Sequence, residues 1–292
     1  MKANTANRTA QYMALFRALE TKRQQRLFTD PYAANFLNAH LQIVSSLSSS
    51  AFISNIISNI IQKKIPGAYT SGLARTKYID DLLQQTITNG AQQVIILGAG
   101  FDTRALRLDY LRHTPVIEID HPDTARLKIN ILKKRNGQLP ANTRYLQIDF
   151  NNQSLDDLLK EHQINYTLPT TIIWEGVTNY LSREAIDATF TVLQKFANRS
   201  AVIFTYVHKQ VLDNPSSFYG AQKLLQDLNN IEERWTFGFY PIVVRSYLNQ
   251  FNFDLIHDKG AAEYRQLYIP ERTSLNKGYE FYRVAFAQTK PR

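Results

Sequence analysis

Short runs of mostly apolar residues, of which Val94–Leu97 is unbroken, recur along the middle of the chain, separated by stretches with helical spacing. Runs of this kind suit strands that are buried on both faces of a parallel sheet. They occur at Val94–Leu97, Val116–Ile119, Tyr145–Ile148, Thr171–Trp174 and Ala201–Phe204. The helical stretches between them are Thr103–Tyr110, Ala125–Lys134, Ser154–Glu161 and Arg183–Phe196. This alternation predicts a doubly wound α/β sheet.

The C-terminal part predicts two more strands, at Phe251–His257 and Tyr279–Ala287, close enough to form an antiparallel pair. They would complete a seven-stranded, mostly parallel, Rossmann-like sheet. No repeat or low-complexity linker interrupts the chain. We therefore expect one domain over residues 1–292, with a helical cap over residues 1–90 and the core over residues 91–292.

Helices are expected before the sheet. Arg8–Leu19 and Gly72–Ile87 have helical spacing, and Asp30-Pro31 is typical of a helix start. The uncharged segment Ile43–Ile61 holds seven Ser and two Asn, and its apolar residues approximate one helix face. It therefore predicts an amphipathic helix rather than a membrane span. Packing on the domain is the usual role of such a stripe, and a lid over a small-molecule site is the alternative.

Composition narrows the function classes. The chain has no cysteine, which excludes disulfides, thiolate metal sites and cysteine nucleophiles. The net charge of +9 suggests nucleic acid, but Lys and Arg are scattered, and the densest run, Lys133–Arg135, falls where a helix should end. We interpret the charge as a solvated surface. Met1–Arg17 has no secretory-signal pattern, so a cytoplasmic location is expected.

The segment Val94–Leu106 holds the first candidate site. A strand runs into Gly98-Ala99-Gly100 and then into a predicted helix, and glycines at such a turn let the backbone approach a ligand closely. The pattern departs from a dinucleotide fingerprint because Thr103 occupies the third glycine position. Asp102 would also repel a pyrophosphate. A ligand with a cationic or neutral group fits better.

Acidic residues follow the next strands. Asp120 lies 20 residues after Gly100, where an acid binds ribose hydroxyls in this topology. Glu118 shares the same strand face, and we favour Asp120. Asp149 and Phe150 end the third strand and suit the amino group and ring face of an adenine. Glu175 ends the fourth strand, at the edge where ligands bind.

Taken together, these segments resemble the leucine carboxyl methyltransferase superfamily, in particular its bacterial branch of S-adenosylmethionine-dependent O-methyltransferases, some of which act on polyketides. The resemblance covers nearly the whole chain. The matching segments are Ala14–Glu20 with Asp30-Pro31, Ala74–Asp81, Leu97–Leu106, Glu118–Pro122, Asp149-Phe150, Trp174–Leu181 and Trp235–Gly238.

The resemblance implies S-adenosyl-L-methionine as cofactor and a role for each matched position. Arg75 should pair with the methionine carboxylate, Gly98 should lie beneath it, and Asp120 should hold the ribose. Asp149 and Phe150 should flank the adenine, with Glu175 near the methionine amino group. Tyr180 matches a position that faces the substrate. An arginine for a carboxylate, and carboxylates for an amine and a sulfonium, are chemically coherent.

The acceptor chemistry leaves alternatives open. A carboxylate acceptor would need no base, whereas an alcohol or phenol would need one nearby. His208, just after the fifth strand, is the candidate, with Tyr206 beside it; no catalytic residue is assigned. No metal is expected, because no Asp-Asn ligand pair follows the fourth strand. Arg75 belongs to the N-terminal segment, so that segment should roof the pocket and exclude water from the transfer.

We expect a small-molecule or carboxylate acceptor and no membrane partner. A protein C-terminal carboxyl group is the first alternative. A nucleic-acid methyltransferase is disfavoured, because Glu175–Thr178 stands where such adenine-amino enzymes carry an Asn/Asp-Pro-Pro-aromatic turn. A non-catalytic cofactor-binding protein is the third alternative, and it requires a closed substrate pocket.

Overall fold

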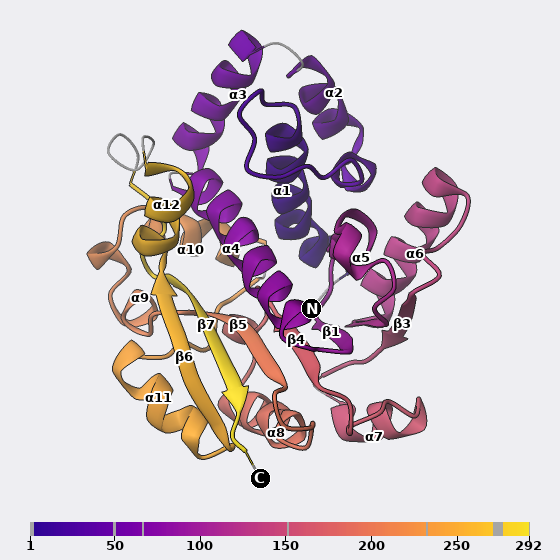
Figure 1. Ribbon diagram of the computed structural model, residues 1–292. Helices are drawn as coiled ribbons and strands as arrows, with labels where there is room; N and C mark the ends of the chain where they lie inside the picture. The colour runs from indigo at the N-terminus through magenta and orange to yellow at the C-terminus, as the bar shows by residue number, and fades with distance from the viewer. Residues whose placement is uncertain are drawn as a thin grey trace.

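Seven strands form one sheet in the order β3-β2-β1-β4-β5-β7-β6 in the computed structural model (Figure 1). The structure describes residues 3–48, 51–65, 67–150, 152–231, 233–270 and 277–291. The strands are β1 Gln93–Leu97, β2 Val116–Asp120, β3 Thr143–Gln147, β4 Thr170–Trp174, β5 Ala201–Val207, β6 Phe253–Gly260 and β7 Tyr282–Thr289. β7 runs antiparallel to β5 and β6, so the predicted antiparallel pair and the seven-stranded, mostly parallel sheet are confirmed.

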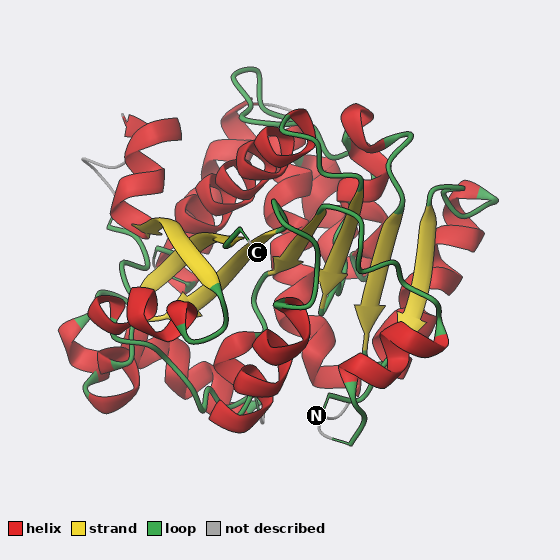
Figure 2. Cartoon of the chain, turned by 60° about the horizontal axis from the view of Figure 1, so that its bottom comes forward, coloured by secondary structure: helices red, strands yellow, loops and turns green. Residues whose placement is uncertain are grey.

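Helices surround the sheet on both faces (Figure 2). The α-helices are α1 Ala3–Thr21, α2 Ala39–Leu47, α3 Ala51–Lys64, α4 Ala68–Thr88, α5 Arg104–Arg107, α6 Pro122–Asn136, α7 Leu155–Glu161, α8 Arg183–Leu193, α9 Gln210–Asp213, α10 Ala221–Asn230, α11 Pro241–Asn249 and α12 Ala261–Tyr268. Short 3-10 helices are η1 Ala33–Phe36, η2 Asp109–Leu111, η3 Thr178–Tyr180 and η4 Pro215–Ser217. No helix among the described residues is long and apolar enough to cross a membrane.

Strand alternation divides the core into two layers. In β1, Ile95 and Leu97 pack with residues of α7, α8 and α11, whereas Val94 and Ile96 pack with residues of α4 and α12. Successive side chains of a strand point to opposite faces, so an apolar strand with no polar positions requires a helix layer on each side. The unbroken apolar run Val94–Leu97 follows from this arrangement.

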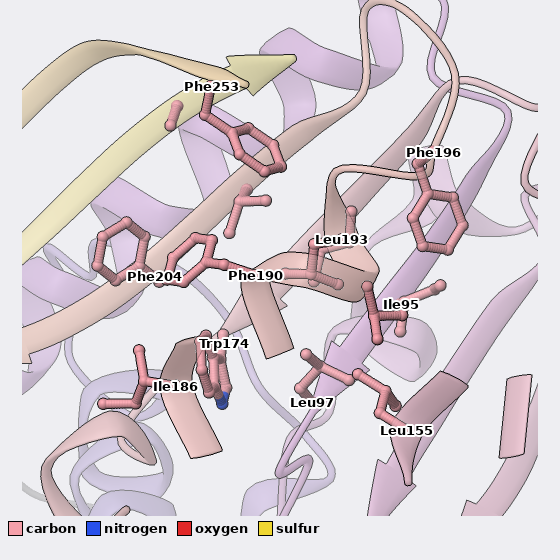
Figure 3. Packing of buried hydrophobic residues seen from close by; sticks show 14 of the residues in the cluster. Ile95, Leu97, Leu155, Trp174, Ile186, Phe190, Leu193, Phe196, Phe204 and Phe253 are labelled. Atoms are coloured by element: carbon pink, nitrogen blue, oxygen red, sulfur yellow. The ribbon is translucent and has the colours of Figure 1, made fainter. Parts of the chain in front are cut away.

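The larger layer centres on Phe190 of α8 (Figure 3). Its ring meets Trp174 of β4 and Phe204 of β5 edge to face, with centroids 5.7 and 5.4 Å away. Edge-to-face contacts of this kind add to the free energy gained from apolar burial. This layer anchors β4, whose end carries part of the site described below.

The segment Ile43–Ile61 differs from its prediction, because it forms two helices, α2 and α3, rather than one. Residues 49 and 50 between them lie outside the described part of the chain. Val44, Ile57 and Ile61 pack on a cluster shared with α1, while Ile43 and Ile60 are about half exposed, at 58% and 49%. The apolar residues that were expected to form one helix face are therefore divided between two short helices, and each helix covers part of the cap.

Two other predicted helices are shorter than expected. Asp30-Pro31 precedes only the 3-10 turn η1, whose first amide, on Ala33, donates to the Asp30 carboxylate at 3.0 Å. The stretch Thr103–Tyr110 is divided into α5 and η2, since Leu108 is extended. At Asp30 the capping chemistry predicted the start of a helical turn, whereas Thr103 makes no side-chain capping hydrogen bond at the start of α5.

Candidate functional site

A cavity of about 1100 Å³ lies at the carboxyl edge of the sheet. Ligands bind at this edge in doubly wound folds, because the loops that leave the parallel strands converge there. The loops after β1, β2, β3 and β4 line one part of the cavity, and α1, α4, α10 and the segment after α10 line the rest. Of the predicted cofactor residues, the cavity is lined by Arg75, Gly98, Gly100, Asp120, Asp149, Phe150 and Glu175, and the predicted substrate residue Tyr180 also lines it.

The glycine turn after β1 has left-handed backbone geometry. Gly98 and Gly100 have φ angles of +65° and +46°, a region that side-chain-bearing residues rarely adopt. A Cβ on Gly98 would lie 2.3 Å from Cγ2 of Val177, which belongs to the loop after β4. Only glycine lets these two loops approach so closely. The turn therefore presents bare backbone to the cavity.

Asp120 and Glu118 are separated by the structure although they share a strand face. Asp120 lies at the end of β2, where its carboxylate accepts hydrogen bonds from the backbone amides of Gly100 and His121. Burial raises the pKa of Asp120, and these two donors act in the opposite direction. Glu118 lies two residues earlier in β2 and pairs with Lys128 of α6, with 2.6 Å between Oε2 of Glu118 and Nζ of Lys128. Of the two carboxylates, only Asp120 lines the cavity.

A network of buried charges supports the same edge. The arginines and carboxylates balance, four against four: Arg17, Arg75, Arg104 and Arg107 with Asp30, Asp80, Asp102 and Glu175. Arg104 lies at its centre, donating from Nε to Asp80 at 2.8 Å and from Nη2 to Glu175 at 2.9 Å, with a third contact to Asp102. Buried charges that are fully paired hold loops in one arrangement.

The ion pairs of this network keep its carboxylates Asp102 and Glu175 ionised. Burial disfavours ionisation of Asp102, but the Arg104 guanidinium outweighs it and lowers the pKa of Asp102 to about 2. Burial likewise acts against the Glu175 carboxylate, and Arg104 and Arg75 hold the pKa of Glu175 below its usual value. Both carboxylates are therefore ionised at neutral pH, each in contact with at least one arginine.

Arg75 approaches the cavity from α4. Its Nε donates to Glu175 at 2.8 Å, and its guanidinium carbon lies 4.6 Å from the ring centre of Tyr282. A guanidinium carries five N–H donors, so Arg75 can hold Glu175 and still donate to a ligand carboxylate. Arg75 and Glu175 together present opposite charges side by side, as a zwitterionic amino-acid group requires.

The structure does not bring Tyr206 and His208 to the cavity lining. Strand alternation points Tyr206 into the layer with Phe204, where its hydroxyl donates to Asp258 of β6 at 2.7 Å. His208 follows β5, but the chain turns there into α9. The His208 ring packs against Phe218 and Tyr240, with centroids 5.4 and 5.6 Å away. Position after a strand indicated the correct edge of the sheet but not the direction of these side chains.

Several cavity residues were missed by sequence reasoning. Arg104 follows the glycine turn closely, so its residue type and its position in the sequence could have indicated a place in the site. Tyr282 at the start of β7 and Glu233 in the segment after α10 gave none, because only the fold brings these C-terminal residues to the loop after β4. Glu233 is buried and accepts a hydrogen bond from Thr9 of α1 at 2.8 Å.

The upper wall of the cavity comes from α1 and α4. Tyr12, Met13 and Phe16 of α1 line it, as do Ser71 and Gly72 of α4. No described residue of the segment Ile43–Ile61 is among the lining residues. The described residues also include no group of three or more metal-ligating His, Cys, Asp or Glu side chains.

The sequence profile of the leucine carboxyl methyltransferase family matches residues 10–194. The chain belongs to this family. A protein of Mycobacterium ulcerans (strain Agy99) is 27% identical over 212 residues, which make up 72% of this chain and 69% of that protein. A protein of Mycobacterium bovis (strain BCG / Pasteur 1173P2) is 30% identical over 193 residues, 65% of this chain and 62% of its own length. The names of both relatives assign them to the S-adenosyl-L-methionine-dependent methyltransferases.

Solved structures share the fold. A Thermobifida fusca protein assigned as a methyltransferase superposes with a TM-score of 0.55 at 16% identity, over 84% of this chain and 91% of that one. A DUF574 family protein of Streptomyces avermitilis gives a TM-score of 0.59 at 10% identity, over 94% and 97% of the two chains. The fold is that of the class I methyltransferases, as the sequence predicted.

Proposed function

We propose that this protein transfers a methyl group to an oxygen atom of a small-molecule or carboxylate acceptor held in the cavity beside the glycine turn. Membership of the family makes the chain an S-adenosyl-L-methionine-dependent methyltransferase. The oxygen acceptor and its class are our proposal. The observation that carries it is that one cavity holds both the glycine turn with the carboxylates that follow the strands and, from other elements, the side chains of Tyr180, Leu228, Trp235 and Tyr282.

The part of the cavity around the glycine turn fits the cofactor. Gly98 supplies a surface that a Cβ would fill, and Asp120 stands at the end of β2 where ribose hydroxyls bind. Asp149 and Phe150 line the wall after β3, and an acid beside an aromatic ring suits adenine. Arg75 and Glu175 suit the carboxylate and amino group of the methionine moiety.

When bound, S-adenosylmethionine supplies a methyl group on a positively charged sulfur, which a nucleophile displaces in line. The protein must then align the acceptor oxygen with that methyl carbon and exclude water. The aromatic walls from α1 and the segment after α10 would exclude water.

Transfer of a labelled methyl group tests the proposal. The protein is incubated with methyl-labelled S-adenosylmethionine and, separately, with small molecules from a bacterial extract, a peptide ending in leucine, and DNA. We expect label in the small-molecule fraction as an ether or ester. Label in the peptide alone would instead indicate a protein C-terminal carboxyl acceptor, and label in DNA would overturn the proposal.

Replacing Asp120 tests the ribose contact. Asp120→Ala should cost roughly 1.5–3 kcal/mol of binding free energy for S-adenosylhomocysteine, the range for hydrogen bonds to a charged group. Titration calorimetry measures it. Glu118→Gln is the matched control, because that carboxylate shares the strand face but pairs with Lys128 outside the cavity lining. Equal affinity of wild type and Asp120→Ala would remove Asp120 from this role.

The roof is a separate proposal, and its position differs from the one expected from sequence. Because α1 and α4 line the cavity and no residue of α2 does, ligand binding should protect α1 rather than α2. Hydrogen exchange of the amides of residues 9–17 should slow when S-adenosylhomocysteine binds. Exchange in α2 serves as the internal control. Equal protection of both helices, or of neither, would contradict a roof formed by α1.

A further inference from the structure

A buried carboxylate lines the part of the cavity that Tyr180, Trp235 and Tyr282 also line, which we call the acceptor part. Glu233 is 2% exposed and lines the cavity with Tyr180, Trp235 and Tyr282. Its Oε2 accepts hydrogen bonds from the Thr9 hydroxyl at 2.8 Å and from the Tyr180 hydroxyl at 3.4 Å. Three separate parts of the chain therefore meet at this carboxylate: α1, the loop after β4 and the segment after α10.

Ring contacts connect this carboxylate to the proposed cofactor part. The ring of Trp235, two residues after Glu233, lies 6.1 Å from the ring of Tyr282 between centroids. Arg75 also lies beside Tyr282, with its guanidinium carbon 4.6 Å from the ring centre. One aromatic side chain thus separates the Arg75–Glu175 pair from the group around Glu233. An acceptor bound beside Tyr282 can contact both.

The other carboxylates of the lining are poorly placed to receive the acceptor proton: Asp102 pairs with Arg104, and Asp120 and Asp149 belong to the proposed cofactor part. Glu175 is held by two arginines, which lower its pKa and so weaken it as a base. Asp227 lies on the exposed side of α10 among water-accessible Lys223 and Arg234. His208, the base expected from sequence, is outside the lining. Glu233 combines burial with a place in the acceptor part.

We propose that Glu233 is the general base of this enzyme and that the acceptor is an alcohol or phenol hydroxyl rather than a carboxylate. The inference rests on the proposed function and names its substrate class. A buried carboxylate accepts a hydrogen bond from a hydroxyl, whereas a second carboxylate beside it would be repelled and would offer no proton. Tyr180 and Thr9 already show that this carboxylate accepts hydrogen bonds from hydroxyl groups.

The reaction step balances with these groups. The acceptor oxygen forms a bond to the methyl carbon as the bond from that carbon to sulfur breaks, and the electron pair goes to sulfur. The acceptor proton passes to the Glu233 carboxylate, which returns it to water after product release. The products are a methyl ether and S-adenosylhomocysteine.

Two variants and the stability of the product to alkali test the inference. Glu233→Gln keeps the shape and hydrogen-bond acceptor but removes the base. Asp213→Asn is the control, because Asp213 also accepts from a tyrosine hydroxyl, that of Tyr240 at 3.1 Å, but is exposed and outside the cavity lining. Wild type, both variants and methyl-labelled S-adenosylmethionine are incubated with the small-molecule fraction of a bacterial extract. Affinity for S-adenosylhomocysteine is measured in parallel.

We expect label that survives alkali and is recovered as an ether. Transfer by Glu233→Gln should fall by about 100-fold or more, the usual contribution of a general base, with unchanged affinity for S-adenosylhomocysteine. Asp213→Asn should match wild type. Release of the label as methanol in alkali would identify an ester and overturn the hydroxyl acceptor. Near-wild-type transfer by Glu233→Gln, or a joint loss of affinity for S-adenosylhomocysteine, would overturn the base. If wild type binds S-adenosylhomocysteine but labels nothing, the proposed function itself fails, and this inference with it.

Discussion

Gly98→Ala should abolish cofactor binding at working concentrations, with a loss of affinity on the order of 100-fold, about 3 kcal/mol. The added Cβ would lie 2.3 Å from Cγ2 of Val177, and the backbone at φ +65° is strained for any residue with a side chain. Relieving the clash moves the loop after β4, which carries Glu175. Both walls of the proposed cofactor part therefore change. Titration calorimetry with S-adenosylhomocysteine measures the loss.

Two further variants separate the clash from backbone strain. Gly90→Ala places a Cβ at φ +97° with nothing within 4 Å, so it carries the strain alone and should bind like wild type. The double variant Gly98→Ala/Val177→Ala removes the clashing methyl groups and should recover most of the affinity. Wild-type binding by Gly98→Ala, or no recovery in the double variant, would contradict the close approach of the two loops as the cause.

Arg104→Met should destabilise the folded protein by about 3–5 kcal/mol, the cost of leaving buried charges without their partner. Arg104 is 3% exposed and contacts Asp80, Asp102 and Glu175. Denaturant unfolding measures the change. Arg112→Met is the control, because the Arg112 side chain is 71% exposed in its pair with Asp109 and should contribute less than about 1 kcal/mol.

The destabilisation by Arg104→Met should also depend on pH. In the wild type the pKa of Asp102 is held at about 2, below its unfolded value near 4, so its stabilisation is present above about pH 4 and is lost as pH falls through 2. Without Arg104 the buried carboxylates can be protonated at higher pH. The difference between variant and wild type should therefore shrink below about pH 4. A difference that is small at pH 7, or constant with pH, would contradict the role of the network.

The centre of the sheet could be predicted because β1, β4 and β5 are buried on both faces and are therefore mostly apolar in sequence. The edge that carries the proposed site could be predicted because Gly98, Asp120, Asp149 and Glu175 each follow a predicted strand, and all four line the cavity. In contrast, Tyr206 lies within β5 and His208 follows it, and the apolar pattern of one strand does not tell which helix layer or loop a side chain enters. Their placement depended on β6 and α9, whose packing no local pattern indicates.

Contacts between residues that are far apart along the chain could not be predicted from the sequence for the same reason. Arg75 and Glu175 are 100 residues apart, and Thr9 and Glu233 are 224 apart. No spacing rule joins residues at such distances, so the carboxylate that we propose as base had no signal along the chain. For the segment Ile43–Ile61, the sequence indicated the helical period of the apolar residues but not the break that divides the segment into α2 and α3.

Titration of the purified protein with S-adenosylhomocysteine, NAD and ATP tests the central claim most directly. If the cavity binds the cofactor through the glycine turn and Asp120, S-adenosylhomocysteine should bind with a stoichiometry near one, while NAD and ATP produce no binding heat. The Asp102 carboxylate beside the turn should reject their phosphates. Binding of NAD or ATP together with silence for S-adenosylhomocysteine would contradict the account.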